Sequence, residues 1–148
     1  MTQDPSYHSS VRLLIVDDSP SALRMLQAVF ENEQYDVLTA SDGQEAYAKA
    51  NQFRPDLVIT DSVMPIMGGF ALLKKLREGA ITRNLPVIIL SAEDPIHAKA
   101  ASGGLIPDAF VMKSDDLQPL IDAVVRVLAE RAEEAKQPTP VEDAAKKP

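Results

Sequence analysis

Five short aliphatic runs, each followed by a stretch of helical periodicity, restrict the fold of this chain more than any other feature. The runs cover residues 11–16, 36–40, 56–60, 86–90 and 108–112. They are almost continuously apolar, which is typical of parallel strands that are buried on both faces. We therefore predict an α/β fold with a doubly wound, five-stranded parallel sheet and helices on both faces. A flavodoxin-like strand order, 2-1-3-4-5, fits the rule that crossover connections are right-handed.

Helix signals occupy the segments between these runs. Ser19 is predicted to cap a first helix that has Pro20 at its first position. Ser41 and Asp42 can cap a second helix, which ends near Phe53. A third helix is expected around residues 70–76, a weaker fourth over 94–102, and a strongly periodic last helix over 117–128.

The composition excludes several kinds of site. The chain has 148 residues, no cysteine, no tryptophan and a net charge of -7. Disulfides and thiolate metal sites are therefore absent, and direct binding to DNA is not expected of so acidic a chain. The apolar runs are too short to cross a membrane, and the first ten residues do not resemble a signal peptide. We expect a cytoplasmic protein that does not insert into membranes.

Chemically active residues gather where the predicted strands end. Asp17 and Asp18 follow the first strand, and Asp61, Ser91 and Lys113 follow the third, fourth and fifth. The carboxyl ends of parallel strands share one edge, where doubly wound sheets bind ligands. Taken singly, each residue has an ordinary explanation as a turn, a helix cap or a surface charge. Their joint placement at four strand ends favours a functional site.

The charges of this cluster predict a metal ion. Three carboxylates and one ammonium group sum to -2, and two carboxylates about 4–5 Å apart repel by roughly 3–4 kcal/mol at an effective dielectric constant near 20. A hard divalent cation would cancel this charge. Because all the ligands are oxygens, Mg²⁺ is favoured, with Mn²⁺ as the alternative. One carboxylate would remain free to act as a nucleophile.

The residues at these strand ends resemble the receiver domain of two-component response regulators. The resemblance is carried, in order along the chain, by LLIVDDSPSALRMLQ, PDLVITDSVMPIMGG, VIILSAE and FVMKS. It implies a stand-alone receiver domain over residues 11–135, flanked by disordered tails at 1–10 and 136–148. Such a domain is a phosphorylation-dependent switch and not a metabolic enzyme, although it catalyses its own phosphotransfer and dephosphorylation.

The resemblance also implies a role for each site residue. Asp61 would accept the phosphoryl group, while Asp17, Asp18, Asp61 and the backbone carbonyl of Val63 would hold Mg²⁺. Ser91 and Lys113 would bind the phosphoryl oxygens. Phe110 would be an aromatic whose rotamer follows Ser91, or alternatively an ordinary core aromatic.

Glu93 and Val63 are the residues that we expect to tune the lifetime of the phosphorylated state. Both would lie on the approach of water to the phosphoryl group, and the sequence does not fix the sign of their effects. The alternative for Glu93 is a solvated loop acid.

The partners implied are a histidine kinase or phosphotransfer protein and a downstream protein target. The target would bind the face formed by the fourth helix, the fifth strand and the last helix. The main alternative is a phosphorylation-independent interaction module that retains only the receiver fold. An aspartate-based phosphohydrolase and a flavin-binding protein fit less well. The former would need a second acid two residues after its nucleophile, and the latter would need phosphate donors where Asp17 and Asp18 stand.

Three features depart from the family pattern. Ser114 follows Lys113 where family members usually have a proline in a cis peptide bond, so this bond is either trans or strained. We expect Ser114 to cap the last helix, with Asp115 and Asp116 in its first turn. Gly68 and Gly69 occupy a position where an acidic residue commonly precedes the glycine. The glycines and proline in residues 102–107 suggest a short or mobile fourth helix.

Overall fold

The predicted parallel sheet is present, with the predicted strand order β2-β1-β3-β4-β5. The computed structural model describes residues 10–94 and 103–136. The strands are β1 (Arg12–Val16), β2 (Asp36–Ala40), β3 (Leu57–Asp61), β4 (Val87–Ser91) and β5 (Ala109–Met112). The helices are α1 (Pro20–Asn32), α2 (Gly43–Phe53), α3 (Gly69–Glu78) and α5 (Gln118–Lys136). The predicted fourth helix and the two predicted tails lie outside the described residues, apart from Asp94 at the start of that helix and the ends of the tails at Ser10 and Lys136.

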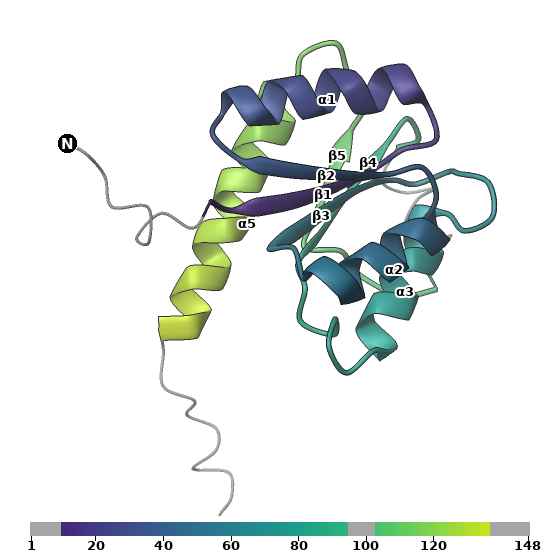
Figure 1. Ribbon diagram of the computed structural model, residues 1–148, viewed down its shortest axis with the longest axis vertical. Coiled ribbons are helices and arrows are strands. Elements are labelled where there is room, and N and C mark those ends of the chain that lie inside the picture. Colours follow the sequence, from purple (N-terminus) through teal and green to yellow (C-terminus); the bar gives the residue numbers. More distant parts are fainter. Residues whose placement is uncertain (1–9, 95–102, 137–148) are drawn as a thin grey trace, which may run out of the picture.

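Helices cover both faces of the sheet, as Figure 1 shows for α1 on one side and α2 and α3 on the other. Within β1, Leu13 and Ile15 pack in the cluster formed with α1 and α5. Leu14 and Val16 belong to the cluster on the opposite face, with α2 and α3. Both faces of a central strand therefore need apolar side chains, which explains why the sequence runs do not alternate.

The helix starts follow the capping signals, with one exception. The Ser19 side chain accepts a hydrogen bond from the Ala22 N–H, and that of Asp42 accepts one from the Glu45 N–H. The last helix begins at Gln118, within one residue of the predicted start, but the predicted cap at Ser114 is wrong. Ser114 Oγ accepts the Asp116 N–H in a turn that precedes α5. Pro119 explains the difference, because a proline lacks the N–H that a helix interior needs and is tolerated only in the first turn.

Two strand ends lie one residue later than the sequence runs suggest. Asp61 pairs with Leu90 and is still part of β3, while Ser91 pairs with Met112 and is still part of β4. The sheet ladder therefore fixes the backbones of both polar residues. Among the described residues, no helix is both long enough and apolar enough to span a bilayer.

Candidate functional site

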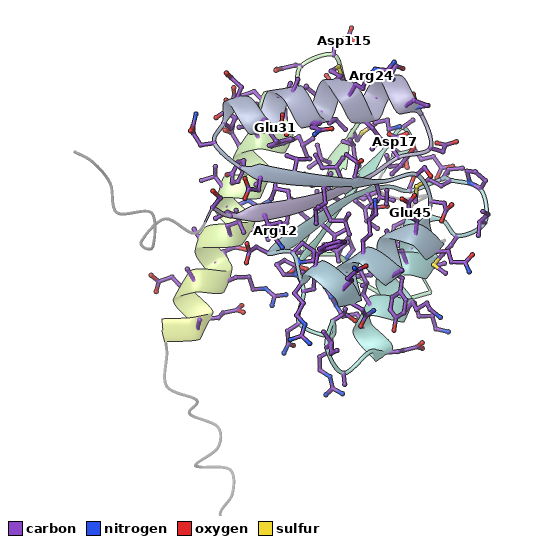
Figure 2. The ribbon with its side chains drawn as sticks, viewed as in Figure 1. Arg12, Asp17, Arg24, Glu31, Glu45 and Asp115 are labelled. Carbon is purple, nitrogen blue, oxygen red and sulfur yellow. The ribbon has the colours of Figure 1, made fainter. Side chains whose placement is uncertain are left out.

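Three carboxylates meet at the carboxyl edge of the sheet, as the strand ends predict. Asp17 follows β1, which begins at Arg12 on the opposite side of the molecule (Figure 2). Asp17, Asp18 and Asp61 each offer a carboxylate oxygen within 4.8 Å of the other two. Asp17 and Asp61 are buried, whereas Asp18 is exposed to solvent. The cluster thus has two fixed carboxylates and one that faces water.

Lys113 follows the edge strand β5 and completes the cluster. Its Nζ lies 3.0 Å from Asp61 Oδ2 and 3.7 Å from Asp17 Oδ2. The Lys113–Ser114 peptide bond is trans, since no cis bond occurs in the described ranges 10–94 and 103–136. The absence of the family's usual proline therefore does not turn Lys113 away from the acidic residues.

The pKa values of Asp17 and Lys113 reflect this crowding. Burial raises the pKa of Asp17, and the charge of Asp61 adds to this, although the Ser19 N–H and Lys113 act in the opposite direction. Burial lowers the pKa of Lys113, but its hydrogen bond to Asp61 and the charges of Asp61 and Asp17 outweigh burial and raise it. The raised pKa of Lys113 shows that a positive charge is stabilised at the site. The raised pKa of Asp17 shows that its negative charge is destabilised there.

The donor set fits a hard divalent cation. Three carboxylates and Lys113 sum to -2, the charge that such an ion would cancel. Oxygen ligands from one or two carboxylates, completed by water, are those that Mg²⁺ prefers. Asp18 is exposed, which leaves one side of the cluster open to solvent and to an entering ion.

Ser91 is fully buried at the end of β4. Its Oγ accepts the Glu93 N–H at 3.0 Å and a hydrogen bond from Ser62 Oγ at 2.8 Å. Sequence reasoning missed Ser62, because only residues at the predicted strand ends were considered and Ser62 follows Asp61. The signal that could have revealed Ser62 is its hydroxyl, which stands directly after Asp61 in the sequence.

Three further predicted residues lie around this edge. Val63 is 67% exposed, and Glu93 is also exposed, so both side chains face solvent beside the site. Phe110 is partly buried and packs against the core cluster that contains α2 and α3. This contact agrees with the alternative of a core aromatic and leaves a role in switching as a proposal.

Gly69 explains how α3 reaches the site. A Cβ at this position would collide with the backbone carbonyl of Asp61. The Gly69 N–H also donates to the Ser62 carbonyl at 2.9 Å. The glycine therefore lets the start of α3 pack directly on the segment that carries Asp61, a constraint that the sequence pattern did not reveal.

The comparisons with known proteins agree with this geometry. The family model of the response regulator receiver domain matches residues 13–125. The chain is 36% identical over 118 residues to protein PilH of Pseudomonas aeruginosa, with 80% of this chain and 98% of PilH covered. It is 41% identical over 85 residues to response regulator PleD of Caulobacter vibrioides, which covers 57% of this chain but only 19% of PleD.

A solved structure that was determined with Mg²⁺-BeF has the same fold. The response regulator TrrA of Thermotoga maritima, determined in complex with Mg²⁺-BeF, has a TM-score of 0.70 and 29% identity to this chain. The likeness covers 78% of this chain and 97% of the TrrA chain. Fold, acidic cluster and family model agree, and this chain belongs to the family of response regulator receiver domains.

Proposed function

We propose that this chain is a phosphorylation-dependent switch in which Asp61 accepts a phosphoryl group from a histidine kinase or a phosphotransfer protein. The observation that carries the proposal is the contact of Lys113 Nζ with Asp61 Oδ2 at 3.0 Å inside the cluster of Asp17 and Asp18. Receiver domains are signalling modules of two-component systems and not metabolic enzymes. Phosphorylation and Mg²⁺ are typical of the family.

The carboxylates of Asp17, Asp18 and Asp61, together with the Val63 backbone carbonyl, would hold Mg²⁺ or Mn²⁺. When bound, the ion would neutralise charge on the phosphoryl oxygens during transfer. The structure of TrrA, determined in complex with Mg²⁺-BeF, supports this assignment. The cluster of oxygens within 4.8 Å supports it independently.

The transfer itself uses the Asp61 carboxylate as the nucleophile. One Asp61 oxygen forms a bond to phosphorus while the bond from phosphorus to the donor histidine nitrogen breaks, and that nitrogen keeps the electron pair. Lys113 would then pair with a phosphoryl oxygen in place of the Asp61 oxygen that it now contacts. Ser91 would donate a hydrogen bond to another phosphoryl oxygen, and Phe110 would change its rotamer with Ser91.

The output would be the binding of a downstream protein. We place the binding face on the fourth helix, β5 and α5; of these, the fourth helix lies outside the described residues. A net charge of -7 makes a protein target more plausible than direct binding to DNA. The match covers 98% of PilH, which supports the receiver domain, at residues 11–135, as the unit that binds the target. We place this activity in the cytoplasm.

Mass spectrometry of the intact protein after incubation with acetyl phosphate tests the proposal. We expect the mass of one added phosphoryl group, which should not appear when Mg²⁺ is chelated before the incubation and should be absent from Asp61→Asn. Hydrogen exchange of the phosphorylated protein should then change on β5 and α5. Labelling of Asp61→Asn at the wild-type yield would show that the acceptor is wrong. Absence of labelling in the wild type would favour the phosphorylation-independent interaction module.

A further inference from the structure

Two serine hydroxyls form a direct hydrogen bond beside the acidic cluster. Ser62 Oγ donates to Ser91 Oγ at 2.8 Å. Ser62 directly follows Asp61 and is half-buried, whereas Ser91 is fully buried. The bond therefore joins the residue next to the proposed phosphoryl acceptor to the proposed phosphoryl-binding hydroxyl.

The hydrogen-bonding capacity of Ser91 defines what this contact does. A serine hydroxyl has one proton to donate and two lone pairs that accept. In this structure the lone pairs of Ser91 receive the Ser62 hydroxyl and the Glu93 N–H, which lies 3.0 Å away. With both acceptor positions filled, the remaining capacity of Ser91 is its own proton.

Backbone hydrogen bonds hold both serines in place. The Ser62 N–H donates to the Leu90 carbonyl at 3.2 Å, and the Ser62 carbonyl accepts the Gly69 N–H at 2.9 Å. The Ser91 carbonyl accepts the Lys113 N–H at 2.7 Å. The backbone of Ser62 is thus held by the sheet and by the start of α3, which keeps its hydroxyl within hydrogen-bonding reach of Ser91.

We propose that Ser62 is a positioning residue that fixes the Ser91 hydroxyl as a hydrogen-bond donor toward the phosphoryl group on Asp61. The inference rests on the proposed function. In the reaction with acetyl phosphate, an Asp61 oxygen bonds to phosphorus as the bond from phosphorus to the acetate oxygen breaks, and acetate leaves with the electron pair. Ser62 does not touch the reacting atoms. It keeps the Ser91 proton available for the phosphoryl oxygen that Ser91 would bind.

A double-mutant cycle measures this coupling. The wild type, Ser62→Ala, Ser91→Ala and the double variant are compared for Mg²⁺-dependent beryllofluoride affinity by calorimetry and for the rate of phosphorylation by acetyl phosphate. We expect Ser62→Ala to weaken beryllofluoride binding by roughly fivefold, in keeping with the loss of one ordinary hydrogen bond. In the Ser91→Ala background, the same substitution should have no further effect.

Two further variants separate positioning from folding. Ser62→Thr keeps a hydroxyl and should restore most of the affinity. Ser41→Ala is a matched control, since Ser41 also follows a strand and its hydroxyl donates to the Glu45 side chain at 2.9 Å, outside the acidic cluster. The Ser41→Ala variant should bind beryllofluoride with wild-type affinity. Thermal unfolding of each protein shows that the fold is retained.

Three results would overturn the inference. The first is an unchanged affinity in Ser62→Ala, which would show that Ser62 does not contribute to binding. The second is a loss from Ser62→Ala that is equal in the wild-type and Ser91→Ala backgrounds, which would show that the two hydroxyls act independently. The third is an unchanged affinity in Ser91→Ala, because Ser91 would then not bind the phosphoryl mimic. A failure of the proposed function is distinguishable from these, because the wild type itself would then take up neither phosphate nor beryllofluoride.

Discussion

The ammonium nitrogen of Lys113 lies 3.0 Å from Oδ2 of Asp61, although the two residues are 52 positions apart in the chain. This contact bridges β4, because β3 and β5 lie on either side of that strand. It compensates one of the buried carboxylates. Asp17 lies further from the lysine, at 3.7 Å, and its pKa is raised chiefly by burial. The cluster therefore retains a net negative charge that a divalent cation would stabilise.

Asp18→Ala should weaken Mg²⁺ binding by roughly tenfold or more, because it removes a proposed direct ligand. Asp18 is exposed, so the substitution is expected to leave the fold intact. Titration calorimetry measures the affinity. Saturating Mg²⁺ should raise the melting temperature of the wild type, since a ligand that binds only the folded state stabilises it by mass action. This rise should be much smaller in the variant.

Asp36→Ala is the matched control for that measurement. Asp36 is an exposed acid at the start of β2, on the edge of the sheet opposite the acidic cluster. It should bind Mg²⁺ with wild-type affinity. Equal affinities of Asp18→Ala and Asp36→Ala would contradict the assignment of the metal ligand.

Most of the sheet and of the acidic cluster could be predicted from the sequence because both follow from periodicity. Buried parallel strands are recognisable as continuous apolar runs, and the residues that end such strands must meet at one edge. Asp17, Asp61 and Lys113 therefore came together as expected. The direction of the Lys113 side chain could not be predicted, since it depends on the conformation of the Lys113–Ser114 bond.

Features that depend on close approach or on a single proline escaped prediction. The apolar pattern places the start of α5 within one residue of Gln118, but the predicted cap at Ser114 is wrong, because Pro119 must lie in the first turn of the helix. The Ser62–Ser91 hydrogen bond needs the actual spacing of two strand ends. The need for Gly69 arises from contact with the Asp61 carbonyl, which no local pattern records.

Glu93→Ala and Val63→Asn should each change the rate of phosphate release by more than twofold. Both side chains are exposed beside the site, where a carboxylate can order or repel an attacking water and an apolar group can narrow its path. Glu93 is also tied to Ser91 through its backbone N–H. The release of inorganic phosphate from the phosphorylated protein measures these rates. Rates within twofold of the wild type, about 0.4 kcal/mol in barrier, would show that neither residue controls access of water.

The stability of the protein should fall in acid partly through Glu45. Its pKa lies below its ordinary value of 4.5, mainly because its carboxylate accepts the Ser41 N–H, with Lys49 adding to the effect. A lowered pKa means that this stabilisation is present above about pH 4.5 and is lost as the pH falls through the folded-state pKa. Urea unfolding at several pH values between about 6 and 3 should therefore show a shallower decline for Glu45→Gln than for the wild type.

Glu78→Gln serves as the control for this pH dependence. Glu78 also pairs with a lysine one turn away, Lys74, but at 3.8 Å on an exposed face of α3. Such exposed pairs contribute little to stability. The unfolding free energy of Glu78→Gln should depend on pH as that of the wild type does. If Glu45→Gln showed the same pH dependence as Glu78→Gln, the role of Glu45 would be refuted.

Asp108→Ala should destabilise the fold by about 2 kcal/mol, because the carboxylate joins three elements at the edge of the sheet opposite the acidic cluster. Its Oδ1 accepts from Arg77 of α3 at 2.9 Å and from the Val87 N–H of β4 at 2.9 Å. Its Oδ2 accepts from Arg131 of α5 at 3.0 Å. Removal would leave two largely covered guanidinium groups and one backbone N–H without this acceptor. Denaturant unfolding measures the loss.

Two comparisons give this last prediction its specificity. Glu130→Ala removes an acid whose contact with Arg126 spans 3.7 Å on the exposed face of α5, and it should change the unfolding free energy by less than about 0.5 kcal/mol. Asp108→Ala should still bind Mg²⁺ and beryllofluoride with wild-type affinity, since β5 separates Asp108 from Lys113. A loss of stability no larger than that of Glu130→Ala would mean that Arg77 and Arg131 find water or other acceptors when the carboxylate is removed. Asp108 would then not be the residue that ties α3 and α5 to the sheet.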